Sequence, residues 1–188
     1  NLISTSKVRN EMIIDDVITC VARKQTPVIL TRFKEHAKFL HDALKEKADH
    51  VFLLYGDNSD KENAEIRVKL KQIPENESLI LVATGQKIGE GFDFPRLDVL
   101  MLAAPVSFEG RLEQYVGRLN RDYVGKEAVY VYDYIDSHVR YFDKMYAKRL
   151  RTYRKMGFSI WTQELQPKQI INAIFDSVNY TEKFEQDI

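Results

Sequence analysis

Residues 79–105 decide the fold, and they read "LILVATGQKIGEGFDFPRLDVLMLAAP". Two apolar runs, 78–84 and 97–104, flank a loop that holds three glycines. Short, continuous apolar runs bounded by Gly and Pro are typical of strands that are buried on both faces, as in a parallel sheet. The stretch therefore predicts two core strands joined through a loop with sharp backbone turns.

The same alternation continues on both sides of this stretch. Further strands are expected at 27–31, 51–55 and 127–135. Helices are expected at 7–24, 33–48, 138–156 and 168–178. Another helix is expected to begin at a capping box formed by Ser59 and Glu62 and to end before Pro74. A further helix is expected to begin at Ser107 and to include the stretch 113–121. Strands that alternate with helices predict an α/β fold in three layers, with a mostly parallel sheet covered on both faces.

Length and composition fit one globular domain with an appendage. The chain has 188 residues, 44% of them hydrophobic and 30% charged, and its formal net charge is zero. We expect an α/β domain at 1–136, in which 1–26 form an approach helix, and a helical extension at 137–188 that ends in an acidic tail. A single cysteine, Cys20, excludes a disulfide within the chain and favours a reducing, cytoplasmic location. The sequence shows no zinc-ligand spacing and no apolar run of membrane length, so we expect neither a metal site nor a membrane partner.

The stretch "QYVGRLNR" at 114–121 places Gln114, Arg118 and Arg121 at the spacing of one helix face. Two guanidiniums on one face can present planar forks to a phosphate, and Gly117 beside them permits close approach of another backbone. A solvated helix face explains the same spacing, and both interpretations remain open at this point. Position favours the ligand, because the predicted helix follows a strand of a parallel sheet.

The loop at 85–95 is the second candidate. Thr84 ends the preceding strand and could donate to a phosphate, and the carboxylate of Asp93 could accept from a sugar hydroxyl. A turn-rich connection in which Asp93 is a local cap is the alternative.

The third candidate is the stretch 138–155, which holds seven Lys or Arg and one acid, Asp143. It is either a contact surface for a phosphate backbone or a surface helix with a polar face. Trp161, which follows it, is expected to pack against the domain.

The order of these segments resembles the second RecA-like domain of superfamily 2 helicases, a P-loop NTPase-type fold. The stretches that carry the resemblance are "VILTRFKEHAKFLHDAL", "VFLLYGDNSDKEN", "LILVATGQKIGEGFDFPRLDVLMLAAP" and "QYVGRLNRDYVGKEAVYVYDYID", which together cover 27–136 in order. Within the superfamily, "GEGFD", "QYxGRLxR" and "VYDYxD" are most similar to helicase subunits of bacterial restriction enzymes. Gln114 stands where DEAD-box proteins have His, which moves the resemblance toward other groups.

The resemblance implies a role for each site residue. It implies that Arg118 and Arg121 are arginine fingers directed at the γ-phosphate of ATP, and that Gln114 orders the same cleft. The residues implied for the nucleotide are Gly91, Asp93 and Gly117. The residues implied for the strand-binding groove are Thr84, Thr31, Arg32, Gly56 and Ser59.

The sequence contains neither a G-x-x-x-x-G-K-[ST] motif nor a D-E-x-x motif. The resemblance therefore implies that ATP and Mg²⁺ are bound mainly by an N-terminal RecA-like domain of the same full-length protein, and that this chain alone is inactive. We expect an ATP-dependent helicase or translocase that acts on nucleic acid, with DNA favoured over RNA. The alternative is a non-catalytic module of the same fold that docks nucleic acid or protein through Lys148, Arg149 and Arg151.

Overall fold

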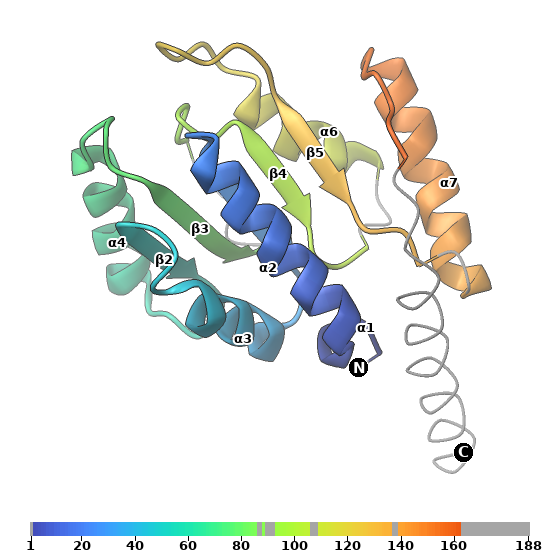
Figure 1. Cartoon of the computed structure of the whole chain (residues 1–188), viewed down its shortest axis with the longest axis horizontal. Helices are drawn as coiled ribbons and strands as arrows, with labels where there is room; N and C mark the ends of the chain where they lie inside the picture. Colours follow the sequence, from blue (N-terminus) through green and yellow to red (C-terminus); the bar gives the residue numbers. More distant parts are fainter. Residues whose placement is uncertain (1, 86–87, 89–92, 106–108, 137–138, 163–188) are drawn as a thin grey trace.

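The computed structural model describes residues 2–85, 88, 93–105, 109–136 and 139–162. Its helices and strands alternate along the chain (Figure 1). In chain order they are α1 (Leu2–Thr5), α2 (Lys7–Ala22), β1 (Pro27–Thr31), α3 (Lys34–Leu44), β2 (His50–Leu54), α4 (Asp60–Gln72), β3 (Leu79–Thr84), β4 (Val99–Leu102), α6 (Glu109–Leu119), β5 (Tyr130–Asp133) and α7 (Arg140–Lys155).

The five strands form one sheet in the order β2-β3-β1-β4-β5, and all neighbouring strands are parallel. All residues of β1, β3 and β4 are buried, which explains why their sequences are continuous apolar runs. The predicted parallel α/β fold and all five predicted strands are confirmed.

Helices cover both faces of the sheet (Figure 1). Ile80 and Val82 point to one face, where they join the core formed with α2 and α3. Leu79 and Leu81 point to the other face, where they join the core formed with α4 and α6. Successive residues of a strand point to opposite faces, so one apolar run serves both cores.

The last described helix, α7, packs against α6 beside the edge strand β5. Arg149 of α7 forms a two-pronged ion pair with Asp133 of β5, with nitrogen–oxygen distances of 2.7 and 2.8 Å. Tyr153 donates a third hydrogen bond to Asp133 at 2.9 Å. Burial, and next the charge of Asp133, raise the pKa of the Tyr153 phenol. This cluster joins the first described helix of the predicted extension to the sheet, while the division into 1–136 and 137–188 stays a prediction.

Two expectations at residue level are wrong. The predicted helix face of 114–121 does not reach Arg121, because α6 ends at Leu119. Trp161 does not pack against the domain, since its exposed fraction is 91%. Phe158 occupies that contact instead: the chain turns at Gly157, where φ is 80°, and the Phe158 ring meets Tyr153 edge to face.

Four expectations lie outside the described residues: the cap at Ser107, the site residue Gly91, the helix at 168–178 and the acidic tail.

Within the part of the chain that the structure describes, no helix is both long enough and apolar enough to cross a membrane. The same residues contain no group of three or more His, Cys, Asp or Glu side chains placed to hold a metal ion.

Candidate functional site

The carboxyl ends of the strands gather the residues that were predicted to contact nucleic acid. Thr31 ends β1 and Thr84 ends β3, and the two are register partners on adjacent strands. Arg32 follows directly and is exposed, with its guanidinium 4.7 Å from the centre of the Phe33 ring. Open α/β sheets bind ligands at this edge, so the fold places these residues where a ligand is expected.

Gly56 and Ser59 follow β2, the strand on the other side of β3. Lys34, at the start of α3, forms an ion pair with Asp57 and thereby joins the 56–59 turn to the segment after β1. A Cβ atom at Gly56 would lie 3.2 Å from Cε of Lys34, so the absence of a side chain lets the lysine cross the turn. The two exposed segments that were predicted to contact a strand are therefore neighbours.

Two of the predicted hydroxyl groups already have partners inside the protein. Oγ1 of Thr31 accepts from the backbone N–H of Phe33 at 3.3 Å and shares a hydrogen bond with Nδ1 of His36 at 3.1 Å. Oγ of Ser59 accepts from the backbone N–H of Glu62 at 3.2 Å, in the capping box that the sequence predicted. Both hydroxyls organise the start of a helix, and helix starts present free backbone N–H groups that suit phosphates.

A second cluster lies around the C-terminal end of α6. Gln114 and Gly117 are exposed and Arg118 is half-buried. A Cβ atom added at Gly117 would meet no heavy atom of the described residues within 4 Å. No described residue packs closely against Gly117, so within the described part of the domain the surface beside it is open to an approaching molecule.

Arg121 and Asp93 come together beyond the end of α6. Nη1 of Arg121 donates to Oδ2 of Asp93 at 3.0 Å, although the two residues are 28 positions apart in the chain. Their side chains are 56% and 51% exposed. The resemblance implied that Arg121 is an arginine finger and that Asp93 contacts the ribose. The sequence did not predict that these two side chains contact each other.

Lys126, which the sequence did not single out, joins the segments of this cluster. Its ammonium group donates to the carbonyls of Leu119 at 2.6 Å and Arg121 at 3.0 Å, and also to the carbonyl of Pro95. It therefore caps the last turn of α6, where unpaired carbonyls favour a cation, and ties that turn to the loop that carries Asp93. Gly125, at a φ of 80°, turns the chain back toward the helix end. Burial lowers the pKa of Lys126, and Asp98 and Asp122 act in the opposite direction. The sequence signal for this cap is the Gly125-Lys126 pair, which stands a few residues after the predicted end of the helix.

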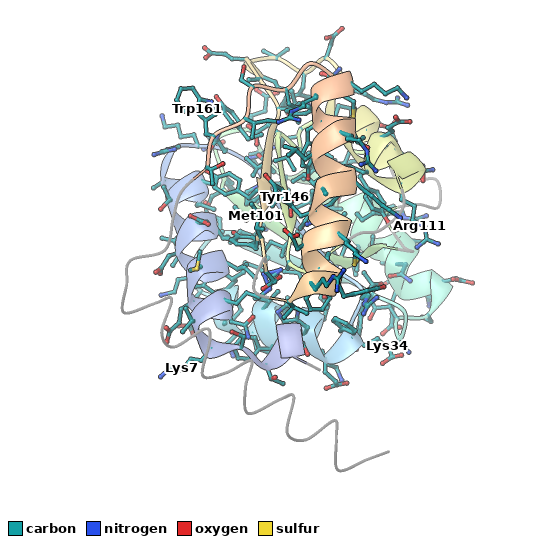
Figure 2. The ribbon with its side chains drawn as sticks, turned by 90° about the vertical axis from the view of Figure 1, so that its right-hand side faces the viewer. Lys7, Lys34, Met101, Arg111, Tyr146 and Trp161 are labelled. Carbon is teal, nitrogen blue, oxygen red and sulfur yellow. The ribbon has the colours of Figure 1, made fainter. Side chains whose placement is uncertain are left out.

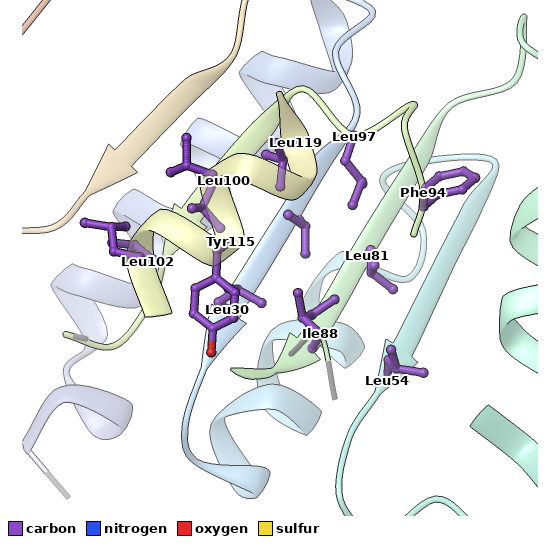
Figure 3. Packing of buried hydrophobic residues seen from close by; sticks show 14 of the residues in the cluster. Leu30, Leu54, Leu81, Ile88, Phe94, Leu97, Leu100, Leu102, Tyr115 and Leu119 are labelled. Carbon is purple, nitrogen blue, oxygen red and sulfur yellow. The ribbon is translucent and has the colours of Figure 1, made fainter. Parts of the chain in front are cut away.

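Tyr115 fixes α6 to the loop that follows β3. Its hydroxyl donates to the carbonyl of Gly85 at 2.9 Å, and its ring lies in the core with Leu30 and Ile88 (Figure 3). A Cβ atom at Gly85 would lie only 2.6 Å from that hydroxyl oxygen, so this contact requires glycine. The two motifs that the sequence analysis treated separately are thus joined by direct contact.

A buried polar network lies behind Thr31. Nε2 of His36 shares a hydrogen bond with Oδ1 of Asn10 at 2.9 Å. The neighbouring Arg9 reaches the carbonyl of Tyr134 and the carboxylate of Asp136, both at 3.5 Å. Burial, and next the charge of Arg9, lower the pKa of His36 to about 4 and keep its ring neutral. The network fixes α2 and α3 at the carboxyl end of β1, and only the positions of Arg9 and Asn10 within an otherwise apolar helix face signalled it.

Comparison with known proteins shows which family and fold the chain resembles. The family model described as the helicase conserved C-terminal domain matches residues 9–122. The transcript termination protein A18 of Yaba-like disease virus is 32% identical over 120 residues, which are 63% of this chain and 24% of that protein. The putative helicase 161L of invertebrate iridescent virus 6 is 33% identical over 118 residues, 62% of this chain and 22% of the relative. The chain thus spans about a quarter of the length of these curated relatives.

Solved structures show the same fold. UvsW of T4 matches 81% of this chain and 33% of its own, with a TM-score of 0.65 and 24% identity. The second domain of the DEAD-box helicase Mss116p, solved bound to an RNA duplex, matches 93% of this chain and 65% of its own, with a TM-score of 0.61 and 16% identity. The fold is therefore RecA-like, as the sequence predicted.

Proposed function

Because the chain belongs to the family of helicase conserved C-terminal domains of superfamily 2, we propose that it is the C-terminal half of an ATP-dependent nucleic-acid motor. The observation that carries the proposal is the exposed Arg121–Asp93 pair just beyond the end of α6, the helix that carries Gln114, Gly117 and Arg118. Guanidiniums on an open face are suited to reach a phosphate that another domain presents. We assign that phosphate to ATP, held with Mg²⁺ mainly by an N-terminal RecA-like domain of the same full-length protein.

We propose that the Arg121–Asp93 pair opens when that domain closes on this one. An ion pair between half-exposed side chains stabilises by only about 0–1 kcal/mol, so a polyphosphate can displace Asp93 from Arg121. Arg121, with Arg118, then stabilises charge on the γ-phosphate, and Gln114 orders the same cleft. The released carboxylate of Asp93 accepts from a ribose hydroxyl, and Gly117 and Gly91 leave room for the nucleotide.

We assign the strand-binding groove to the ends of β1, β2 and β3. Arg32 and the 56–59 turn are its exposed parts, and backbone N–H groups at the starts of α3 and α4 supply donors. Thr31 and Thr84 lie deeper, since their exposed fractions are 3% and 7%. Their contribution is to shape the groove, in addition to any contact through the backbone.

We propose DNA as the nucleic acid. The similarity of "GEGFD", "QYxGRLxR" and "VYDYxD" to restriction-enzyme helicase subunits supports this choice, and that kinship stays a prediction. The transcript termination proteins and UvsW among the relatives leave the pathway open, so unwinding and translocation are both compatible with the proposal.

The test is ATP hydrolysis by a protein that joins this domain to its N-terminal RecA-like domain, measured with and without DNA. We expect Arg118→Ala and Arg121→Ala to lower kcat by a factor on the order of 10³–10⁵, the range seen when an arginine finger is removed. Arg23→Ala, at an exposed position outside the site, is the matched control and should keep full activity. Full activity in both finger variants would refute the assignment.

A non-catalytic docking module is the second candidate, because α7 exposes several cations. One residue of that hypothesis is wrong: Arg149 is buried against Asp133 and is not available to a ligand. The module predicts that Arg118 and Arg121 are dispensable while the exposed cations of α7 are required.

A further inference from the structure

The solvent face of α7 is almost uniformly basic. Of the seven cations in this region, only Arg149 is buried, beside Met145, Thr152 and Tyr153. The other six are exposed, and we call them the α7 basic stripe: Arg140, Lys144, Lys148, Arg151, Arg154 and Lys155. At 3.6 residues per turn these six fall within an arc of about 120°, opposite the buried residues. The stripe therefore faces away from the domain.

Among the residues that the structure describes, few acids balance this charge. The only acid of α7 is Asp143, and Lys155 pairs with Glu113 of α6 at 3.0 Å. The six cations, less these two carboxylates, leave four positive charges on one helix face. Because the whole sequence has a formal net charge of zero, the concentration of cations is local to this surface.

The stripe lies apart from the groove that we assign to the motor. β5, beside α7, and β2, which precedes the 56–59 turn, are the two edge strands. With about 4.8 Å between neighbouring strands, the two edges are roughly 19 Å apart. Figure 1 shows α7 beyond β5, and Figure 2 looks onto its outer side. A molecule on the stripe would thus make contacts beyond those at the strand ends.

We propose that the α7 basic stripe binds the phosphate backbone of nucleic acid outside the motor groove, an inference that rests on the proposed function. At 1.5 Å per residue the stripe is about 22 Å long. One strand of duplex DNA carries a phosphate about every 3.4 Å along the axis, so the stripe spans roughly six of them. Tyr141, three residues before Lys144 and 61% exposed, adds an aromatic surface beside the stripe.

The composition of the stripe favours nucleic acid over an acidic protein. Protein interfaces are built around a buried apolar core and are depleted in lysine. The stripe has three lysines and three arginines, and Tyr141 is the only exposed large hydrophobic residue of α7. Lys and Arg without an apolar core are the composition of a surface that contacts phosphates.

The test measures DNA binding by the two-domain protein with labelled oligonucleotides, single- and double-stranded, at several salt concentrations and without ATP. Lys148→Gln combined with Arg151→Gln removes two charges from the centre of the stripe. Lys45→Gln combined with Lys47→Gln removes two exposed charges at and after the end of α3 and is the matched control. Circular dichroism checks that both variants are folded.

We expect the stripe variant to weaken binding on the order of tenfold at about 0.1 M salt, and to reduce the slope of log K against log salt by about 1.4–1.8. A reduction near 1.4 indicates a single strand on the stripe and one near 1.8 a duplex. The control should match the wild type. At saturating DNA the stripe variant should keep the wild-type kcat for ATP.

Binding of polyglutamate, a mimic of an acidic protein, is measured with the same variants. Three results would overturn the proposal: an unchanged slope of log K against log salt, an equal loss of DNA affinity in the control, or a stripe variant that loses binding to polyglutamate but keeps its binding to DNA. The last would assign the stripe to an acidic protein. Since binding is measured without hydrolysis, failure of the stripe is separate from failure of the motor. The motor fails if Arg118→Ala and Arg121→Ala retain activity.

Discussion

His36 makes the stability of the domain depend on pH. Its pKa is lowered from 6.5 to about 4 by burial and by Arg9, whereas an unfolded histidine titrates near its ordinary value. Between these values the unfolded state binds a proton that the folded state does not. The stability that His36 contributes in its neutral form is therefore complete above about pH 6.5. It is lost as the pH falls toward 4, and the free energy of unfolding then decreases by about 3 kcal/mol at most. Urea unfolding at about pH 7 and about pH 4.5 measures it.

The quantity compared across variants is the difference between the free energies of unfolding measured at the two pH values. His36→Gln should lose stability at both values, because it disturbs the bonds to Thr31 and Asn10, but its loss on acidification should be smaller than that of the wild type. His41→Gln, at a partly exposed histidine, is the control and should keep the wild-type difference. An identical pH difference in His36→Gln and the wild type would contradict the prediction.

Residue types in the candidate site were predictable from the sequence, but their partners were not. The spacing of Gln114, Arg118 and Arg121 predicted one helix face, which holds for Gln114 and Arg118, whereas Arg121 lies two residues beyond the end of α6. The Arg121–Asp93 pair was not predictable, because it depends on how the segment before β4 meets the segment after α6. Periodicity also could not show that α6 ends before Arg121, since Lys126 caps the helix from beyond its end. Trp161 was placed wrongly because hydrophobicity alone does not say which of two nearby aromatic residues meets the core.

The buried Asp133–Arg149 pair joins α7 to β5, and its side chains are 9% and 3% exposed. Removing one partner leaves a buried charge without compensation, which costs about 3–5 kcal/mol. We expect Asp133→Asn to destabilise the domain by about this amount in urea unfolding. Asp133→Leu combined with Arg149→Met should destabilise it less than the sum of the two single changes, because no charge is then left alone.

Proteolysis gives an independent measure of that docking. Asp133→Asn should expose sites within α7 to trypsin earlier than the wild type does, because α7 is rich in Lys and Arg. Lys155→Gln, which removes an ion pair with a 76% exposed lysine, is the control and should change stability by less than about 1 kcal/mol. If the destabilisation by Asp133→Leu combined with Arg149→Met equals the sum of the two single changes, the pair does not hold α7.

Elements were predictable to the extent that local chemistry sets them. Continuous apolar runs identified β1, β3 and β4, and the Ser59–Glu62 capping box identified the start of α4. Strand order was not predictable from these signals, since the sheet places β3 between β1 and β2 by crossover connections. The contact between α7 and β5 was hidden as well: Arg149 looks like its basic neighbours in sequence, and only packing separates it from them.

The whole molecule places its candidate surfaces around one sheet. The groove residues lie at the ends of β1, β2 and β3, the arginines lie around the end of α6, and the basic stripe lies beyond β5. Tyr115 links the first two through Gly85, so a movement of α6 that accompanies nucleotide binding would be felt at the end of β3. In the proposed motor the nucleotide is presented from another domain, and Arg121, whose side chain is 56% exposed, is the more accessible of the two arginines, since Arg118 is half-buried.

This arrangement predicts that the chain hydrolyses no ATP by itself. The 188 residues lack the G-x-x-x-x-G-K-[ST] motif that holds the β- and γ-phosphates, so Arg118 and Arg121 have no bound phosphate to stabilise. Phosphate release by the purified chain, with DNA and Mg²⁺ present, should not exceed that of an Arg121→Ala sample purified in parallel. Fusion to the N-terminal RecA-like domain should produce DNA-stimulated turnover that Arg121→Ala abolishes. Turnover by the isolated chain that depends on Arg121 would instead mean that the domain contains a complete nucleotide site, and the half-motor proposal would have to be abandoned.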